Sequence, residues 1–199
     1  MKKNFLVVIF VFLSLFFTNT TFSYSSDPKL FISEVVDEAK KILVATNSKE
    51  FKEKELSSIA LRAADIKGIG FYTLGKYRKK LTEEELIEYS KLFEKYFLKS
   101  FTSRLTDYSD PKIEVIGADV VNPKYTIVRS VLLATDKKPE VKIDWRVYTK
   151  NPDKPLIRDL IVEGLSLART QKEEFASVIE SNNGDVKKLF ITLKEFVNK

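Results

Sequence analysis

IRDLIVEGLSLARTQKEEF, residues 157–175, joins the pattern of a β-strand to the pattern of a helix start. The strand half is apolar on both faces, with Leu160 and Val162 on one face and Ile157 and Ile161 on the other. A small antiparallel sheet with one face in water alternates apolar and polar residues more strictly. The second apolar face of this strand therefore needs an explanation.

Three more strands are predicted before this segment. Short turn signals rich in Pro, Asn and Asp separate them, and such short connections favour an antiparallel meander. The four predicted strands are Lys112–Val120, Lys124–Thr135, Glu140–Thr149 and Leu156–Glu163.

The second and third of these strands differ in pattern. The third alternates, with Val141, Ile143, Trp145 and Val147 on one face and Lys142, Asp144, Arg146 and Tyr148 on the other. The second is apolar on both faces, with Ile127, Val131 and Leu133 against Val128 and Leu132. The second and the fourth predicted strands are thus apolar on both faces. Either helices cover both faces of the sheet, or one face borders a cavity.

Helices are predicted before and after the strands. Thr82 with Glu85 forms a capping box, and Thr170 with Glu173 forms a second one. The predicted helices cover 27–46, 48–64, 65–77, 82–105, 170–180 and the residues from 185 onward. The helix at 82–105 has an unusually aromatic stripe, which ordinary core packing would also explain. Its members are Leu86, Tyr89, Phe93, Tyr96, Phe97, Phe101 and Leu105.

The glycines at the third predicted helix do not form a nucleotide-binding motif. Gly68, Gly70 and Gly75 are spaced G-x-G-x-x-x-x-G, whereas a dinucleotide fingerprint needs G-x-G-x-x-G after a buried strand. We expect instead a helix whose glycines let another element approach closely.

The N-terminus has the pattern of a secretory signal peptide. Two lysines precede the apolar run Phe5–Phe17, and Thr18–Ser26 is small and polar, with cleavage expected after Ser23 or Ser25. We therefore expect a signal peptide at residues 1–23 and a single exported domain at 24–199. In a bacterium, that compartment is the periplasm.

Composition excludes several kinds of chemistry. The chain of 199 residues has no Cys and no His, so disulfides, a conventional catalytic triad and the commonest metal ligand are absent. Residues 1–23 hold two lysines and no acid, so their removal would lower the formal charge from +6 to +4. Lys and Glu are mixed along the helices, which is not the clustered charge of a nucleic-acid binder. No cofactor is expected.

Several segments, taken in order, resemble the MlaC or toluene-tolerance family. They are 65–97, 142–147, 157–179 and 183–193. The most telling motifs are Leu74-Gly75-Lys76-Tyr77 before a capped helix and Val162-Glu163-Gly164 followed by Ser166. Many relatives carry Trp where this chain has Arg78, a departure that affects local packing.

The resemblance implies a periplasmic carrier of phospholipid and not an enzyme. Its fold would be α+β, with a curved four-stranded antiparallel sheet packed by about six helices around an apolar cavity. Its partners would be an outer-membrane lipid-collecting complex and an inner-membrane ABC transporter with a lipid-binding subunit. On this reading the second apolar face of the sheet lines the cavity, opposite the aromatic stripe. The candidate lipid-binding residues are Tyr72, Leu74, Leu86, Phe93, Tyr96, Phe97, Phe101, Ile127, Val131, Ile143, Trp145, Val147, Leu160 and Val162.

Three other readings remain open at this point. The chain could bind another hydrophobic molecule, such as an isoprenoid or an aromatic solvent. It could be an enzyme on a cone-shaped α+β scaffold that uses Asp144, Tyr148 or Asp159. It could also be a structural envelope protein whose aromatic stripe is core.

Overall fold

The computed structural model describes residues 23–136 and 138–199. The predicted signal peptide lies outside the described residues, except for its last one. In the described part, helices come first, strands follow, and helices close the chain, as predicted. The elements are α1 Pro28–Val44, α2 Lys49–Ala63, α3 Ile66–Leu74, the 3₁₀ helix η1 Gly75–Lys80, α4 Glu83–Leu105, β1 Ile113–Asn122, β2 Tyr125–Leu132, β3 Val141–Tyr148, β4 Leu156–Val162, β5 Leu165–Ser166, α5 Leu167–Glu180 and α6 Val186–Asn198.

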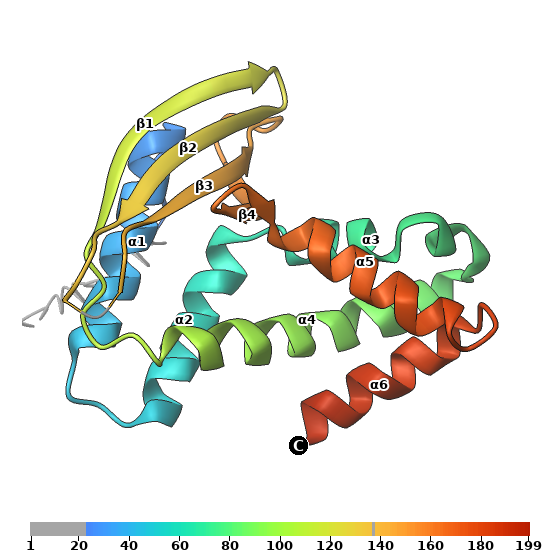
Figure 1. Ribbon diagram of the computed structural model, residues 1–199. Coiled ribbons are helices and arrows are strands. Elements are labelled where there is room, and N and C mark those ends of the chain that lie inside the picture. Colours follow the sequence, from blue (N-terminus) through green and yellow to red (C-terminus); the bar gives the residue numbers. More distant parts are fainter. Residues whose placement is uncertain (1–22, 137) are drawn as a thin grey trace, which may run out of the picture.

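The strands form one antiparallel sheet in the order β1-β2-β3-β4-β5, and Figure 1 shows that it is strongly curved. The prediction of an α+β fold is correct, but the number of strands was one too low. Glu163 and Gly164 have positive φ angles of 49° and 81°. Two such residues make a tight hairpin turn, which folds the two-residue strand β5 back onto the end of β4.

A β-bulge in β4 corrects the predicted faces of that strand. Trp145 pairs with Leu160, but Val147 pairs with Ile157, so β4 has one extra residue between these pairs. The bulge puts Ile157 on the same face as Leu160, whereas strict alternation had placed it with Ile161. Arg158 points to the opposite face, where its Nε donates to Asp65 Oδ2 at 2.7 Å.

The helix caps follow the sequence, with one exception. The capping box of Thr82 and Glu85 is present at the start of α4. The predicted box at Thr170 is wrong, because Ser166 caps α5 and accepts from the Arg169 amide at 3.1 Å. Thr170 lies inside the helix and donates from Oγ1 to the Ser166 carbonyl. Ser166 is the last residue of β5, so the helix begins directly where the sheet ends.

The glycine-rich helix α3 lies very close to α4, as its sequence predicted. A Cβ atom added at Gly70 would lie 2.7 Å from Cδ1 of Phe93, well inside van der Waals contact. Gly70 therefore permits an approach that any side chain would prevent. This contact joins α3 to the aromatic stripe of α4.

The buried apolar side chains form two separate clusters. The sheet cluster joins α1 and α2 to one face of the sheet: Phe31, Ile32, Val35, Val36, Leu43, Leu56, Ile59, Ala63, Val128, Trp145, Val147 and Ile157. The helical cluster joins α3, η1, α4, α5 and α6: Ile66, Ile69, Leu74, Tyr77, Tyr89, Phe93, Ala168, Phe175, Ile179, Val186, Leu189, Phe190 and Leu193. The partly buried Ala64 contacts both clusters.

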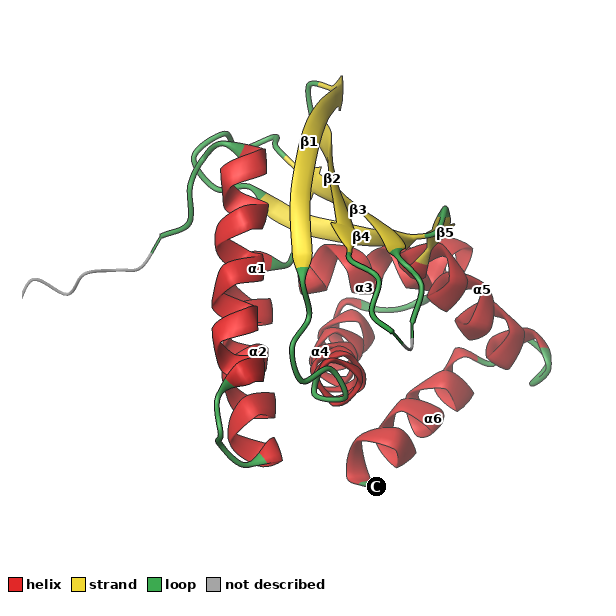
Figure 2. Ribbon diagram, turned by 60° about the vertical axis from the view of Figure 1, so that its left-hand side comes forward, coloured by secondary structure: helices red, strands yellow, loops and turns green. Residues whose placement is uncertain are grey.

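Figures 1 and 2 both show α4 passing beneath the sheet, with α1 and α2 on one side of it and α5 and α6 on the other. The helices in close contact with the sheet are α1, α3 and α5, while α4 packs mainly against α2, α3 and α6. Within the described residues, none of these helices has the length and apolar character needed to span a bilayer.

Candidate functional site

The face of the sheet that packs on α1 and α2, here called the inner face, is mainly apolar. The inner-face residues of the three central strands are Thr126, Val128 and Ser130 of β2, Ile143, Trp145 and Val147 of β3, and Ile157, Leu160 and Val162 of β4. The indole Nε1 of Trp145 donates to Ser130 Oγ at 2.8 Å, and that hydroxyl donates to the Ile143 carbonyl at 2.9 Å. These polar atoms are thus satisfied within the sheet, which leaves an apolar surface.

Burial decreases along the inner face. Val128 and Val147 are completely buried in the sheet cluster, and Trp145 is 9% exposed. Ile143 and Leu160 are only partly buried at the edge of that cluster, and Val162 pairs with Ile143 beyond them. The β3 and β4 candidates therefore form one continuous surface that runs from a filled core to a partly open end.

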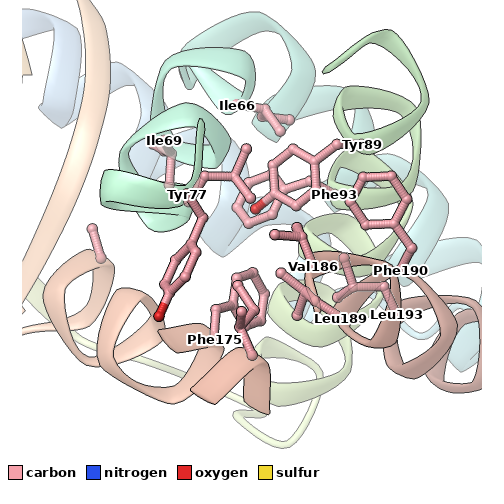
Figure 3. Close-up of a cluster of buried hydrophobic side chains, with 13 residues drawn as sticks. Ile66, Ile69, Tyr77, Tyr89, Phe93, Phe175, Val186, Leu189, Phe190 and Leu193 are labelled. Atoms are coloured by element: carbon pink, nitrogen blue, oxygen red, sulfur yellow. The ribbon is translucent and has the colours of Figure 1, made fainter. Parts of the chain in front are cut away.

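The side chains of the helical cluster come from several helices and pack together (Figure 3). Phe93 and Leu74 are completely buried in it, and Leu86 packs against it. The hydroxyls of Tyr89 and Thr73 are hydrogen-bonded at 2.8 Å, and burial raises the pKa of Tyr89. The buried candidates Leu74 and Phe93 are therefore core residues in this conformation. For Phe93, this agrees with the explanation of the stripe as ordinary core packing.

The aromatic stripe of α4 leaves the helical cluster and continues toward the sheet cluster. Tyr96 is partly buried, with its hydroxyl donating to Gln171 Oε1 at 2.8 Å. Phe97 packs against the helical cluster, and its ring stacks on that of Phe101 with centroids 5.7 Å apart. Leu105, one turn further, packs against the sheet cluster. Phe101 is half-buried and belongs to neither cluster, so it lies where the two cores separate.

Two of the candidates lie on the opposite face of the sheet. Ile127 pairs with Arg146 and Val131 pairs with Lys142, so neither can share a surface with Trp145. The prediction grouped them with the β3 candidates because β2 is apolar on both faces, and its pattern alone does not show which face is inner.

Ile127 and the exposed candidate Tyr72 line a pocket of about 440 Å³ on this opposite face. The pocket is mixed in character, since it also contains two arginines and an acid. Its lining residues are Gly68, Ile69, Tyr72, Val121, Asn122, Tyr125, Ile127, Arg146, Arg158, Asp159 and Ala168.

Asp159, one of the residues that the enzyme reading named, has structural partners. Asp159 accepts from Ser166 Oγ at 2.6 Å and from the Ala168 amide at 3.0 Å, and Arg146 lies 3.4 Å away. It therefore holds the start of α5 against the sheet. The neighbouring Arg158 pairs with Asp65, and its guanidinium carbon lies 3.6 Å from the ring centroid of Tyr148.

Sequence reasoning missed two residues of this region. Leu105 is in the stripe but was not among the candidates, although it completes the row from Phe97. Ser130, whose hydroxyl holds the indole of Trp145, carried no sequence signal, because its role depends on the register of β2 and β3.

Comparison with known proteins gives a family and a fold. The chain matches the family model described as MlaC protein over residues 33–195. Its fold is similar to the solved structure of the phospholipid-binding protein from Ralstonia solanacearum in complex with a phospholipid, at 20% identity and a TM-score of 0.71. That similarity covers 84% of this chain and 94% of the other. No curated protein sequence matches the chain. The resemblance of the segments at 65–97, 142–147, 157–179 and 183–193 predicted this family. Since the family model spans most of the sequence, the chain belongs to the MlaC family.

Proposed function

We propose that this protein is a carrier that binds a phospholipid and shuttles it through the periplasm between an outer-membrane lipid-collecting complex and an inner-membrane ABC transporter. The acyl chains lie in an apolar cavity between α4 and the inner face of the sheet, and the head group faces solvent. Membership of the MlaC family and a fold shared with a protein solved with bound phospholipid support this proposal. The protein acts as a binding protein and not as an enzyme.

The observation that carries the proposal is the division of the core. A domain of this size normally has one contiguous core, but here two clusters are separated, and Phe101 of α4 belongs to neither. Partly buried apolar side chains lie at the edges of the two clusters: Phe97 of α4 packs against the helical cluster, and Leu105 of α4 packs against the sheet cluster, as do Ile143 and Leu160. Apolar surface left between two cores is what acyl chains would cover.

Energetics explain why such a ligand needs a carrier. Each methylene group in water costs about 0.8 kcal/mol, so one chain of about 16 carbons costs on the order of 12 kcal/mol. Free diffusion of a diacyl lipid through water is therefore negligible. The free energy of transfer from a bilayer to an apolar cavity is close to zero. The direction of transport must therefore come from different affinities at the two docking partners or from ATP hydrolysed by the transporter.

The test is to extract the exported protein with organic solvent and to identify co-purified molecules by mass spectrometry. We expect a diacyl phospholipid at near-equimolar ratio. An isoprenoid or another apolar molecule in its place would favour the binder of a different ligand, and a folded protein without any lipid would contradict the proposal.

A matched pair of variants locates the cavity. Phe101→Asp puts a charge where the chains are proposed to lie, and we expect it to abolish co-purification, because a buried unpaired carboxylate is very unfavourable. Ile191→Asp makes the same kind of change at an exposed position on α6 and should leave the lipid content unchanged. Equal lipid content in both folded variants would exclude Phe101 from the cavity.

A further inference from the structure

A second hollow, of about 500 Å³, lies where α3, η1 and the first turns of α5 meet. It is strongly basic and partly aromatic. Its lining residues are Phe71, Tyr72, Gly75, Arg78, Lys79 and Lys172. We call this hollow the basic pocket. It contains none of the buried inner-face residues proposed to contact acyl chains.

Aromatic rings hold two of the three cations of the basic pocket. The guanidinium carbon of Arg78 lies 4.3 Å from the ring centroid of Phe71, and Nζ of Lys172 lies 5.2 Å from that of Tyr72. Both distances are within the range of cation–π contacts. The cations are therefore positioned without being neutralised, since a ring contributes no net charge.

Gly75 lies against the side chain of Lys172 in this arrangement. Its φ angle is +52°, and a Cβ atom added there would lie 2.8 Å from Cε of Lys172. Because Gly75 has no side chain, the side chain of Lys172 can extend from α5 over η1. Its ammonium group then lies near Arg78 and Lys79, although α5 is distant in sequence.

The three cations of the basic pocket have no carboxylate partner in the part of the chain that the structure describes. Within the described residues, no acidic oxygen lies within 4.0 Å of the charged nitrogens of Arg78, Lys79 or Lys172. The neighbouring Lys76 is different, because it pairs with Glu180 at 3.0 Å. The basic pocket thus combines three uncompensated charges in a concave site, which favours binding of an anion.

We propose that the basic pocket binds the phosphate groups of anionic phospholipids at a bilayer surface and so docks the protein on the membrane. A guanidinium presents paired donors that match phosphate oxygens, and lysines add point charges. Tyr72, which is 44% exposed beside the cations, suits the boundary between head groups and acyl chains, where amphipathic rings are favoured. This exposed ring favours a bilayer over an acidic protein segment as the ligand.

This docking goes beyond the proposed carrier function, because a lipid can be carried inside a protein that never binds a bilayer surface. The two claims can also fail separately. Lipid content is measured on the purified protein, whereas docking is measured by adding vesicles.

The experiment is co-sedimentation of the exported protein with vesicles of phosphatidylcholine, with and without phosphatidylglycerol, at low salt. Each basic residue near an anionic surface contributes about 1 kcal/mol, so the variant R78Q/K79Q/K172Q should bind phosphatidylglycerol vesicles about 100-fold more weakly. The control K54Q/K150Q/K188Q removes the same charge from exposed positions outside the pocket and should bind within about threefold of the unmodified protein.

A single substitution protects the test against misfolding. Lys79 is exposed, so K79Q alone should leave unfolding curves unchanged and still weaken vesicle binding about fivefold. Equal binding of the pocket and control variants would overturn the proposal. So would equal binding to vesicles with and without phosphatidylglycerol, binding of inorganic phosphate alone without vesicle binding, or binding of an acidic peptide in place of vesicles.

Discussion

Ser166 donates from its hydroxyl to Oδ2 of Asp159 at 2.6 Å, and this bond ties the beginning of α5 to the middle of β4. Oδ1 of the same carboxylate accepts from the Ala168 amide at 3.0 Å. The Asp159 side chain is only 2% exposed. One buried acid therefore anchors the start of the helical tail on the sheet.

Replacing that acid should destabilise the whole domain. In Asp159→Ala the buried Ala168 amide loses its acceptor and Ser166 loses its partner, so we expect the free energy of unfolding to fall by about 3 kcal/mol. Urea denaturation followed by circular dichroism measures this change. The control Asp153→Ala alters an exposed loop acid and should change stability by less than about 0.5 kcal/mol. Equal midpoints for both variants would contradict the structural role of Asp159.

The contact between α3 and α4 gives a second prediction. In Gly70→Ala the new methyl group meets the completely buried ring of Phe93, which cannot move without disturbing the helical cluster. We expect a loss of about 1 to 3 kcal/mol in thermal or urea unfolding. Gly117→Ala is the matched control, because its new methyl group would meet only the flexible end of Arg129. A neutral effect of the first substitution would show that α3 can move away from α4.

Tyr24 should titrate abnormally. Burial, followed by its hydrogen bond to Glu38, raises the pKa of Tyr24 from 10.0 to about 12. A raised pKa means that the folded protein holds this proton more tightly than the unfolded chain does. Its stabilising contribution is therefore complete below pH 10 and is lost as the pH rises toward 12. NMR titration of labelled tyrosine rings, with Tyr24→Phe to assign the signal, measures this. Titration of Tyr24 near 10 would contradict the buried placement.

The same residue predicts the processing site. The Tyr24 ring packs edge-to-face on Phe31 with centroids 5.5 Å apart, and its hydroxyl bonds to Glu38. Cleavage after Ser23 would keep these contacts, whereas cleavage after Ser25 would remove them. We expect intact mass spectrometry of the exported protein to give a mature chain that begins at Tyr24. A chain that begins at Ser26 would show that the contacts are dispensable.

Most of the architecture follows from local patterns in the sequence. Thr82 with Glu85 predicted the start of α4, the alternation from Val141 to Tyr148 predicted β3, and Gly70 predicted a close helix contact. Each of these signals acts between residues near in sequence or through one small side chain. Such features depend little on the rest of the fold.

The errors in the sheet have a common physical cause, since each depends on pairing across strands. The bulge at Arg158 turned Ile157 to the inner face, and no local pattern marks a bulge. Ile127 and Val131 were assigned to the wrong surface, because a strand that is apolar on both faces does not reveal its orientation. The sequence could thus predict which strand faces and which helix stripe are apolar. It could not predict which of these surfaces face each other.

Trp145 allows the central claim to be measured directly, because it is the only tryptophan of the chain and lies on the inner face of the sheet. The measurement is quenching of its fluorescence by bound phospholipid that carries a spin label either in the middle of an acyl chain or on the head group. If the acyl chains lie between α4 and the inner face, the chain label should quench strongly and the head-group label weakly. Binding of the labelled lipid with no quenching by the chain label would contradict this location of the ligand.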